Sequence, residues 1–226
     1  MPAAGSSRRM GVSEKPKQYL ELAGRHVIDW ALTPFVSHPG CRGVVVVLSP
    51  GDVHWADTEY AVSALVSVAP GGAERAHSVL SGLDSLDGRA QPDDWVLVHD
   101  AARPCLSRAD LDCLLRALQD DAVGGLLAAP VVDTLKRADA EQSVYETVSR
   151  TSLWRAMTPQ MFRYELLRNA LRSSIGSHVP VTDEAQALEL QGYRPKLIAG
   201  DADNIKITTS DDLERARRIL NARQFV

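Results

Sequence analysis

The sequence has few cysteines, and their positions exclude the common cysteine-based sites. The 226 residues include three, Cys41, Cys105 and Cys113, an odd number without any C-x-x-C pair. Such a set is typical of buried or free thiols in a reducing compartment, not of a disulfide framework or a zinc site. The chain also shows no apolar run long enough to cross a bilayer and no signal peptide. We therefore expect a cytoplasmic protein with no membrane association.

A surplus of positive charge is missing as well. Lysine and arginine number 25 against 29 acidic residues, for a net charge of −4. This balance excludes a general nucleic-acid binder, so any anionic ligand must be held by local basic residues. Hydrophobic residues make up 45% of the chain, which is enough for a packed core. Because no internal repeat, low-complexity tract or long linker divides the sequence, we predict a single domain over residues 1–226.

The clearest signal that is present lies in residues 96–104. Residues 96–98 are apolar and predict a fully buried parallel strand, which leads directly to Asp100. In open α/β sheets, ligands bind at the carboxyl ends of the strands. The alanines at 101–102 leave room for a ligand close to the backbone, and Arg103 offers a rigid fork of donors for phosphate or hydroxyl groups. The alternative is an ordinary strand-to-loop exit with solvated charges.

Strand-like and helix-like segments alternate along most of the chain. We predict strands at 43–48, 65–68, 96–98, 125–132, 196–199 and 203–208. We predict helices at 26–35 (ending near Pro34), at 52–64, from about 75 onwards, at 107–118, around 166–171, after Thr182 and after Ser210. Ser107, Thr182 and Ser210 are the expected N-caps. This alternation predicts an α/β fold with a doubly wound, mostly parallel, Rossmann-like sheet and helices on both faces.

The segment at about 133–150 breaks the alternation. Two strand-like runs, 133–137 and 144–148, are joined by the polar turn 138–142, which predicts a β-hairpin. The hairpin is too polar to belong to the core. We interpret it as an arm that grips a partner subunit, although a plain surface excursion is also possible.

Two segments near the N-terminus have the residues needed to bind phosphate. Residues 2–5 are small, so their backbone N–H groups can approach a phosphate or a base, and Arg8 and Arg9 follow. Further along, Pro16 stiffens the chain just before Lys17. The alternatives are a frayed terminus and an ordinary solvated lysine.

Taken together and in this order, the motifs are specific. The chain resembles the methylerythritol phosphate cytidylyltransferases of the non-mevalonate isoprenoid pathway over nearly its whole length. The segments that carry the resemblance are Pro2–Gly5, Arg8–Met10, Pro16–Tyr19, Gly71–Arg75, Ser78–Val79, Val98–Pro104, Asp133–Thr134, Thr158–Phe162, Thr182–Ala185 and Asn204–Thr208. Several matched blocks in one order make a chance similarity very improbable.

The resemblance implies transfer of CMP from CTP to methylerythritol phosphate, with Mg²⁺ and release of pyrophosphate. It implies a cytidine pocket made of Ala3, Ala4, Gly5, Gly72, Ala73, Ser78 and Ala101. Asp100 resembles the residue near the sugar hydroxyls and the magnesium ion. The implied holders of methylerythritol phosphate are Arg103, Thr134, Arg150, Thr158, Thr182 and Lys206. The expected catalytic residues are Arg9 and Lys17 on the CTP phosphates, with Arg150 and Lys206 on the acceptor.

The resemblance also implies a homodimer, in which the arm carries Thr134 and Arg150 toward the neighbour's active site. The chemistry agrees with these roles. The nucleophile is a phosphate oxygen that is already ionised at pH 7, so no general base is needed. Catalysis should consist of positioning two anions and neutralising charge on the α-phosphate. Lysine, arginine and a single carboxylate meet that demand, and none of the six histidines needs a chemical role.

Two departures from the family pattern bear on the fold. The family has a second glycine where Ser7 stands, and a side chain there would crowd the nucleotide or strain the backbone. The family also has an apolar strand before the Pro2–Gly5 loop. Either residues upstream of Met1 supply that strand, or sheet edges remain unpaired and the core is exposed.

Three other functions compete with this interpretation. The nearest is a cytidylyltransferase for another sugar-alcohol phosphate such as ribitol phosphate, which would share the cytidine motifs and differ on the acceptor side. A nucleotide-binding module without catalysis is the second, motivated by Ser7 and the absent strand. A dinucleotide-binding oxidoreductase is the weakest, because the G-x-G-x-x-G spacing is absent from the first loop.

Overall fold

The computed structural model describes residues 1–5 and 15–224 and has an α/β architecture. Its strands are β1 (Glu21–Leu22), β2 (Arg25–His26), β3 (Val44–Leu48), β4 (Val66–Pro70), β5 (Trp95–Val98), β6 (Gly124–Pro130), β7 (Leu135–Ala138), β8 (Val144–Val148), β9 (Trp154–Arg163) and β10 (Lys196–Ala199). The α-helices are α1 (Val27–Val36), α2 (Arg75–Asp84), α3 (Arg108–Leu118), α4 (Tyr164–Gly176), α5 (Glu184–Glu189) and α6 (Ser210–Gln224). The predicted α/β class is therefore confirmed, and within the described residues no helix is long and apolar enough to cross a bilayer.

The main sheet has the strand order β10-β6-β9-β5, and β3 and β4 form a separate parallel pair. Strand β10 is parallel to β6, whereas β9 is antiparallel to both β6 and β5. The prediction that residues 96–98 lie fully buried among parallel strands is wrong in two respects. Their hydrogen-bonded partner runs the other way, and of these three residues only Val98 is fully buried.

Strand β9 is the element that sequence patterns missed. Its ten residues alternate apolar side chains with Arg155, Gln160 and Arg163 and include Pro159, so the stretch does not read as one apolar run. It nevertheless lies between β5 and β6, and its residues 157–162 are buried. This strand therefore connects the arm to the centre of the sheet.

Two predicted elements did not form. Residues 52–64 contain only the 3₁₀ turn η3 (Trp55–Asp57), because the Asp52 carboxylate accepts hydrogen bonds from the backbone of His54 and Trp55 and makes a turn instead. Residues 203–208 form no strand, since their backbone bonds to neighbouring turns and to Ala102. Helix α1 also continues through Pro34 to Val36.

The helix caps are partly as predicted. Ser107 accepts from the backbone N–H of Asp110 at 3.0 Å and caps α3. Asp183, not Thr182, caps α5, because its carboxylate accepts from the Gln186 N–H at 2.9 Å. Ser210 lies inside α6 as its first residue rather than before it. All three cysteines are free, as predicted.

A gap separates β3 from β5. Residues 1–3 begin to fill it: the Met1 carbonyl accepts from Val47, and the Ala3 N–H donates to the Val47 carbonyl at 2.8 Å. The rest of the space is a cavity of about 660 Å³, lined by side chains of β3, β5 and α2 such as Val45, Leu97 and Leu83. Among the described residues no strand pairs with both β3 and β5, so the β3–β4 pair and the main sheet are separate.

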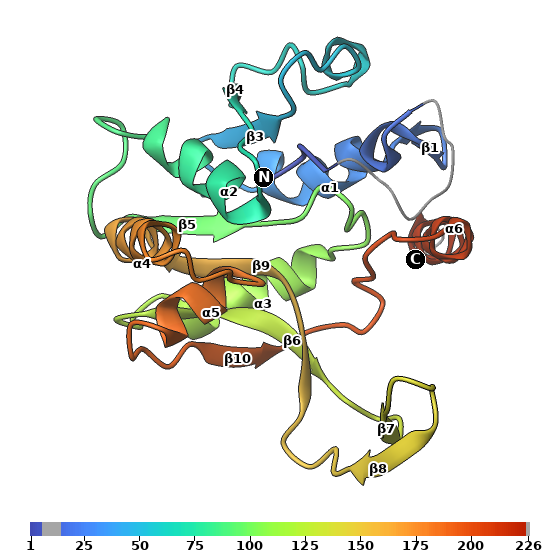
Figure 1. The fold of residues 1–226 in the computed structure, drawn as a ribbon. Helices are drawn as coiled ribbons and strands as arrows, with labels where there is room; N and C mark the ends of the chain where they lie inside the picture. Colours follow the sequence, from blue (N-terminus) through green and yellow to red (C-terminus); the bar gives the residue numbers. More distant parts are fainter. Residues whose placement is uncertain (6–14, 225–226) are drawn as a thin grey trace.

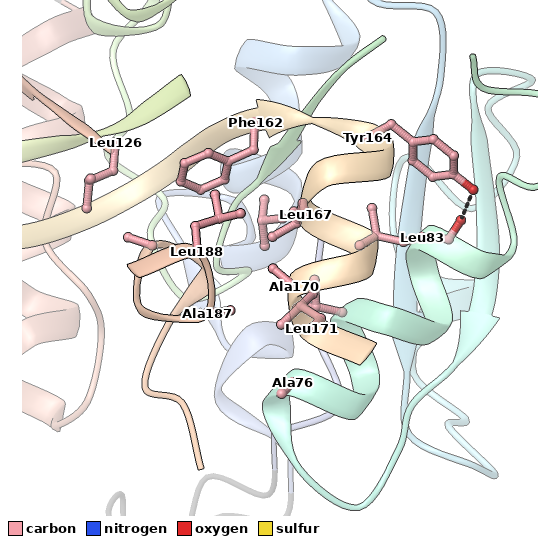
Figure 2. Close-up of a cluster of buried hydrophobic side chains, with 13 residues drawn as sticks. Ala76, Leu83, Leu126, Phe162, Tyr164, Leu167, Ala170, Leu171, Ala187 and Leu188 are labelled. Atoms are coloured by element: carbon pink, nitrogen blue, oxygen red, sulfur yellow. Dashed lines mark hydrogen bonds between the residues drawn. The ribbon is translucent and has the colours of Figure 1, made fainter. Parts of the chain in front are cut away.

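A large apolar cluster lies between the main sheet and the helices that cover it (Figure 2). It packs α4 and α5 against α2 and strand β9, with Phe162 and Leu167 fully buried. The Tyr164 hydroxyl lies at the edge of the cluster and donates to the Leu83 carbonyl at 3.2 Å. This packing holds the starts of α2 and α5 in fixed positions beside β5.

The arm stands clear of the sheet (Figure 1). Strands β7 and β8 pair antiparallel, and the Arg137–Glu146 ion pair joins them on the ribbon. Val144 and Tyr145 are 63% and 71% exposed, so the ribbon buries little apolar surface in this chain. The hairpin at 133–150 is confirmed as an element; its role in joining subunits stays a prediction.

Candidate active site

A cavity of about 290 Å³ lies at the carboxyl end of β5 and brings most of the predicted nucleotide residues together. The predicted residues that line it are Ala3, Ala4, Gly5, Lys17, Gly72, Ala73, Ser78, Asp100, Ala101 and Lys206. They come from five separate stretches of the sequence. The place agrees with the rule that ligands of open α/β sheets bind beyond the carboxyl ends of the strands.

The N-terminal loop forms one wall of the cavity. Its backbone is fixed by two side chains: Gln18 donates to the Ala3 carbonyl at 2.7 Å, and Ser49 donates to the Ala4 carbonyl at 3.1 Å. Ala3 is buried, whereas Gly5 is exposed. Small side chains at these positions leave the backbone open to a flat ligand such as a base.

The glycine turn before α2 forms the opposite wall. A Cβ at Gly71 would lie 2.5 Å from that of Ala4, and a Cβ at Gly72 would lie 2.4 Å from that of His77. Both contacts are too close for any other residue, so the turn requires glycine twice. Ser78 is buried, and its hydroxyl donates to the Glu74 carbonyl and accepts from the Gly72 N–H at 3.1 Å. Ser78 therefore shapes the turn from within the helix.

The floor of the cavity is a cluster of charges around Asp100. Its Oδ1 accepts from Arg75 at 3.1 Å and its Oδ2 from Lys206 at 2.7 Å. Burial raises the pKa of the Asp100 carboxyl, but Arg75 and Lys206 outweigh it and hold that pKa well below its usual range. Asp100 is therefore an anion at every pH at which the enzyme would work.

The two lysines of the cavity meet at the segment 205–207: Lys17 contacts it, and Lys206 belongs to it. Lys17 donates from Nζ to the Ile207 carbonyl at 2.9 Å, next to Lys206. Ile205 and Ile207 are buried on one side of this segment, and Lys206 points to the other, as the alternation predicted. The sequence pattern thus located the cationic face correctly even though no strand forms there.

Arg103 and Thr158 lie behind Asp100 rather than in the cavity. Arg103 donates from Nη1 to the Asn204 carbonyl at 2.7 Å, and its Nε is 3.8 Å from Oδ2 of Asp100. The buried Thr158 hydroxyl accepts from the Asp100 N–H and bonds to Nδ1 of His99. His99 in turn contacts the Arg103 carbonyl at 3.0 Å, and burial lowers its pKa to about 4. Neutral His99 thus has a structural role, as expected.

Three predicted acceptor residues lie away from the cavity in this chain. Thr182 is exposed, and its hydroxyl donates to the Gln186 side chain at 3.0 Å. Thr134 and Arg150 are exposed at the base of the arm, where Arg150 donates to the Val132 carbonyl. A single chain does not bring these side chains to Asp100, so their roles stay predictions.

Arg9 and Ser7 lie outside the described residues. The metal role of Asp100 also stays a prediction, and the described residues hold no group of three or more His, Cys, Asp or Glu that could bind an ion by themselves. A single carboxylate nevertheless suits Mg²⁺ that is bound mainly through substrate phosphates. Asp100 can supply one such oxygen ligand, although Arg75 and Lys206 contact both of its oxygens.

Sequence reasoning assigned no role to three residues of the cavity: Gln18, Glu74 and Arg75. The last two belong to the glycine turn that supports the family resemblance, so the motif contained the signal. Gln18 stands beside Lys17 and shows no pattern of its own, because its role depends on a contact with a distant segment.

Comparisons with known proteins agree with this geometry. The model of the 2-C-methyl-D-erythritol 4-phosphate cytidylyltransferase family matches residues 1–222. A protein of that name from Pseudomonas aeruginosa (strain UCBPP-PA14) is 55% identical over 219 residues, 96% of this chain and 93% of the relative. Another of that name, from Azoarcus sp. (strain BH72), is 52% identical over 100% of this chain and 94% of its own.

Solved structures show the same fold. A crystal structure of 4-diphosphocytidyl-2C-methyl-D-erythritol synthase has a TM-score of 0.82 and 42% identity, covering 91% of this chain and 94% of that one. The Francisella tularensis 2-C-methyl-D-erythritol 4-phosphate cytidylyltransferase has a TM-score of 0.83 and 34% identity, covering 96% of each chain. These matches agree with the cavity at the end of β5 and with the charge cluster around Asp100. They show that the chain belongs to the 2-C-methyl-D-erythritol 4-phosphate cytidylyltransferase family.

Proposed function

We propose that this enzyme transfers CMP from CTP to 2-C-methyl-D-erythritol 4-phosphate, giving 4-diphosphocytidyl-2-C-methyl-D-erythritol and pyrophosphate. The observation that carries the proposal is the convergence of ten predicted residues on one cavity in a chain of this family. A phosphate oxygen of the acceptor attacks the α-phosphorus of CTP. The new P–O bond forms as the bond to the bridging oxygen breaks, and pyrophosphate leaves with that electron pair.

The residues of the cavity supply position and charge for this step. Ala3, Ala4 and Gly72 leave backbone space for the cytosine ring, while Lys17 faces the phosphates. We assign Arg9 to the same phosphates on the basis of the family pattern. Lys206 contacts Asp100, and we assign it to the incoming acceptor phosphate on the basis of the family pattern. Because the nucleophile carries its charge already, these groups act without transferring a proton.

We propose Asp100 as the residue that would hold Mg²⁺, together with oxygens of the nucleotide. When bound, the ion supplies additional neutralisation of phosphate charge. Lys206 and Arg75 contact both carboxylate oxygens, which keeps Asp100 ionised and oriented. The protein's own contribution is thus a fixed anion with cations on either side.

We further propose that the chain is one domain and works as a homodimer whose arms complete the sites in trans. An isolated two-stranded ribbon is marginal in water, so β7 and β8 need a surface to lie on. The exposed Val144 and Tyr145 suit such a contact. In that arrangement Arg150 and Thr134 would reach the acceptor of the neighbouring chain, and Arg103, Thr158 and Thr182 would support it from within.

The test is a pyrophosphate-release assay with CTP and Mg²⁺ and a panel of acceptors. We expect turnover with methylerythritol phosphate at least about tenfold above that with ribitol phosphate, and none with ATP in place of CTP. Faster turnover of ribitol phosphate would assign the enzyme to the other substrate. Calorimetric binding of CTP without pyrophosphate release on any acceptor would identify a binding module instead.

A further inference from the structure

Arg75 is a half-buried arginine that lines the cavity, and the mechanism above gives it no contact with either substrate. It is the first residue of α2, directly after the glycine turn. Its guanidinium reaches two carboxylates: Asp100 just after β5 and Glu184 at the start of α5. Three elements that are distant in the sequence therefore meet at one side chain.

The contacts use the whole guanidinium fork. Nη1 and Nη2 donate to the two oxygens of Glu184 at 2.5 and 3.0 Å. Nη2 and Nε donate to Oδ1 of Asp100 at 3.1 and 3.3 Å. A lysine ammonium is a point charge and cannot span two carboxylates in this way.

Glu184 depends on this contact. Its side chain is 0% exposed, and Arg75 is the cation that the structure places against it. Two buried carboxylates close to one another repel, so the arrangement is stable only with the arginine between them. The fork therefore sets the distance between the end of β5 and the start of α5.

Gln160 makes a second set of contacts that holds the start of α5 in place. Gln160 of β9 accepts from the Ala185 N–H at 2.8 Å and donates to the Asp183 carboxylate at 2.9 Å. Gln160 and Arg75 together fix the turn 182–184, which carries Thr182. On the other side, Arg75 orients Asp100, whose second oxygen meets Lys206.

We infer that Arg75 is a positioning residue that holds the nucleotide side of the site, Asp100, in register with the acceptor side, the turn 182–184. The inference rests on the proposed function and goes beyond it, since it assigns the alignment of the two substrates to one ion-paired fork. Because a misplacement of about 1 Å can cost about 10²-fold in rate, loss of the fork should affect turnover more than binding.

The experiment compares Arg75→Lys with a matched control, Arg168→Lys. Arg168 on α4 also contacts several carboxylates, Asp84, Asp87 and Glu165, but it lies outside the cavity. We expect Arg75→Lys to lower kcat by about 10- to 100-fold and to raise the KM for the acceptor several-fold, with the dissociation constant for CTP within about threefold of wild type. Arg168→Lys should keep wild-type kinetics.

A double variant separates positioning from stability. Arg75→Met alone leaves Glu184 and Asp100 without their shared cation and should lower Tm. Arg75→Met combined with Glu184→Gln removes one charge of each sign, so it should recover most of that Tm but not kcat. Recovery of kcat together with Tm, or wild-type kcat in Arg75→Lys, would overturn the inference. If wild type itself releases no pyrophosphate, the proposed function fails instead, and the two failures are distinguishable.

Discussion

The charge cluster around Asp100 and the arm formed by β7 and β8 contrast sharply. In the cluster, Asp100 is 8% exposed and bonds to Arg75 and Lys206 from two other parts of the chain. In the arm, Arg150 and Thr134 are exposed, and within the described residues neither contacts another predicted site residue. Both regions hold charged residues expected to bind the same substrates. We propose that the half of the site around Asp100 is complete within one chain and that the half carried by the arm is completed by a second chain.

The largest effect is expected in the complete half. Lys17→Ala should lower kcat by about 10²–10³-fold, because it removes a cation aimed at the phosphates. Little stability should be lost, since the lysine is only half-buried and its Nζ contacts a backbone carbonyl, that of Ile207. Steady-state kinetics and Tm measurements check this. The control is Lys196→Ala, because Lys196 lies on the edge strand β10 and pairs with Asp121. Wild-type turnover in Lys17→Ala would remove it from the mechanism.

A second substitution in the cluster tests the magnesium role. Asp100→Asn should abolish most activity and weaken the dependence of the rate on Mg²⁺ concentration, because the amide carries no charge. Arg75 would keep its pairing with Glu184, so the fold should survive. The measurement is initial rate against Mg²⁺ concentration for both proteins. An unchanged magnesium response would mean that Asp100 does not bind the ion and is only a residue at the end of a strand.

Subunit mixing tests the incomplete half. Arg150→Ala and Lys17→Ala chains should each be nearly inactive, and mixing them should restore about a quarter of wild-type activity. Random exchange makes half of the dimers mixed, and each mixed dimer has one site with both residues intact. If the arm folded back on its own chain, every site would lack one residue and mixing would restore nothing.

The smallest expected effect concerns the histidine behind the cluster. Burial lowers the pKa of His99 to about 4, against about 6.5 in an unfolded chain, so the unfolded state binds the proton first as the pH falls. Stability should therefore decline between about pH 6.5 and pH 4, by up to about 3 kcal/mol. Urea unfolding at several pH values measures this slope.

The variant for this test is His99→Gln, which keeps a donor and an acceptor for Arg103 and Thr158. It should flatten the pH dependence between those limits, whereas His178→Gln, at an exposed position, should leave it unchanged. An equally steep decline in His99→Gln would mean that other groups cause it. The low pKa of Asp100 adds a separate loss only at more acidic pH.

Much of this protein follows from its sequence. The apolar runs at 44–48, 95–98 and 124–130 and the leucine spacing of α3 determine these elements, because hydrophobic periodicity is a property of a short segment. The polar pattern at 133–150 determined the arm in the same way. Glycine at 71–72 is required by close packing, and its motif identified one wall of the cavity.

Tertiary structure alone decided the rest. Strand β9 entered the sheet antiparallel despite its polar residues, because partners distant in sequence outweigh local preference. Arg75 joins Asp100 and Glu184, which are 84 positions apart in the sequence, so no local pattern could reveal its role. Local periodicity specifies helices and strands. Which charged side chains meet in the site depends on the tertiary fold, because it brings segments distant in the sequence together.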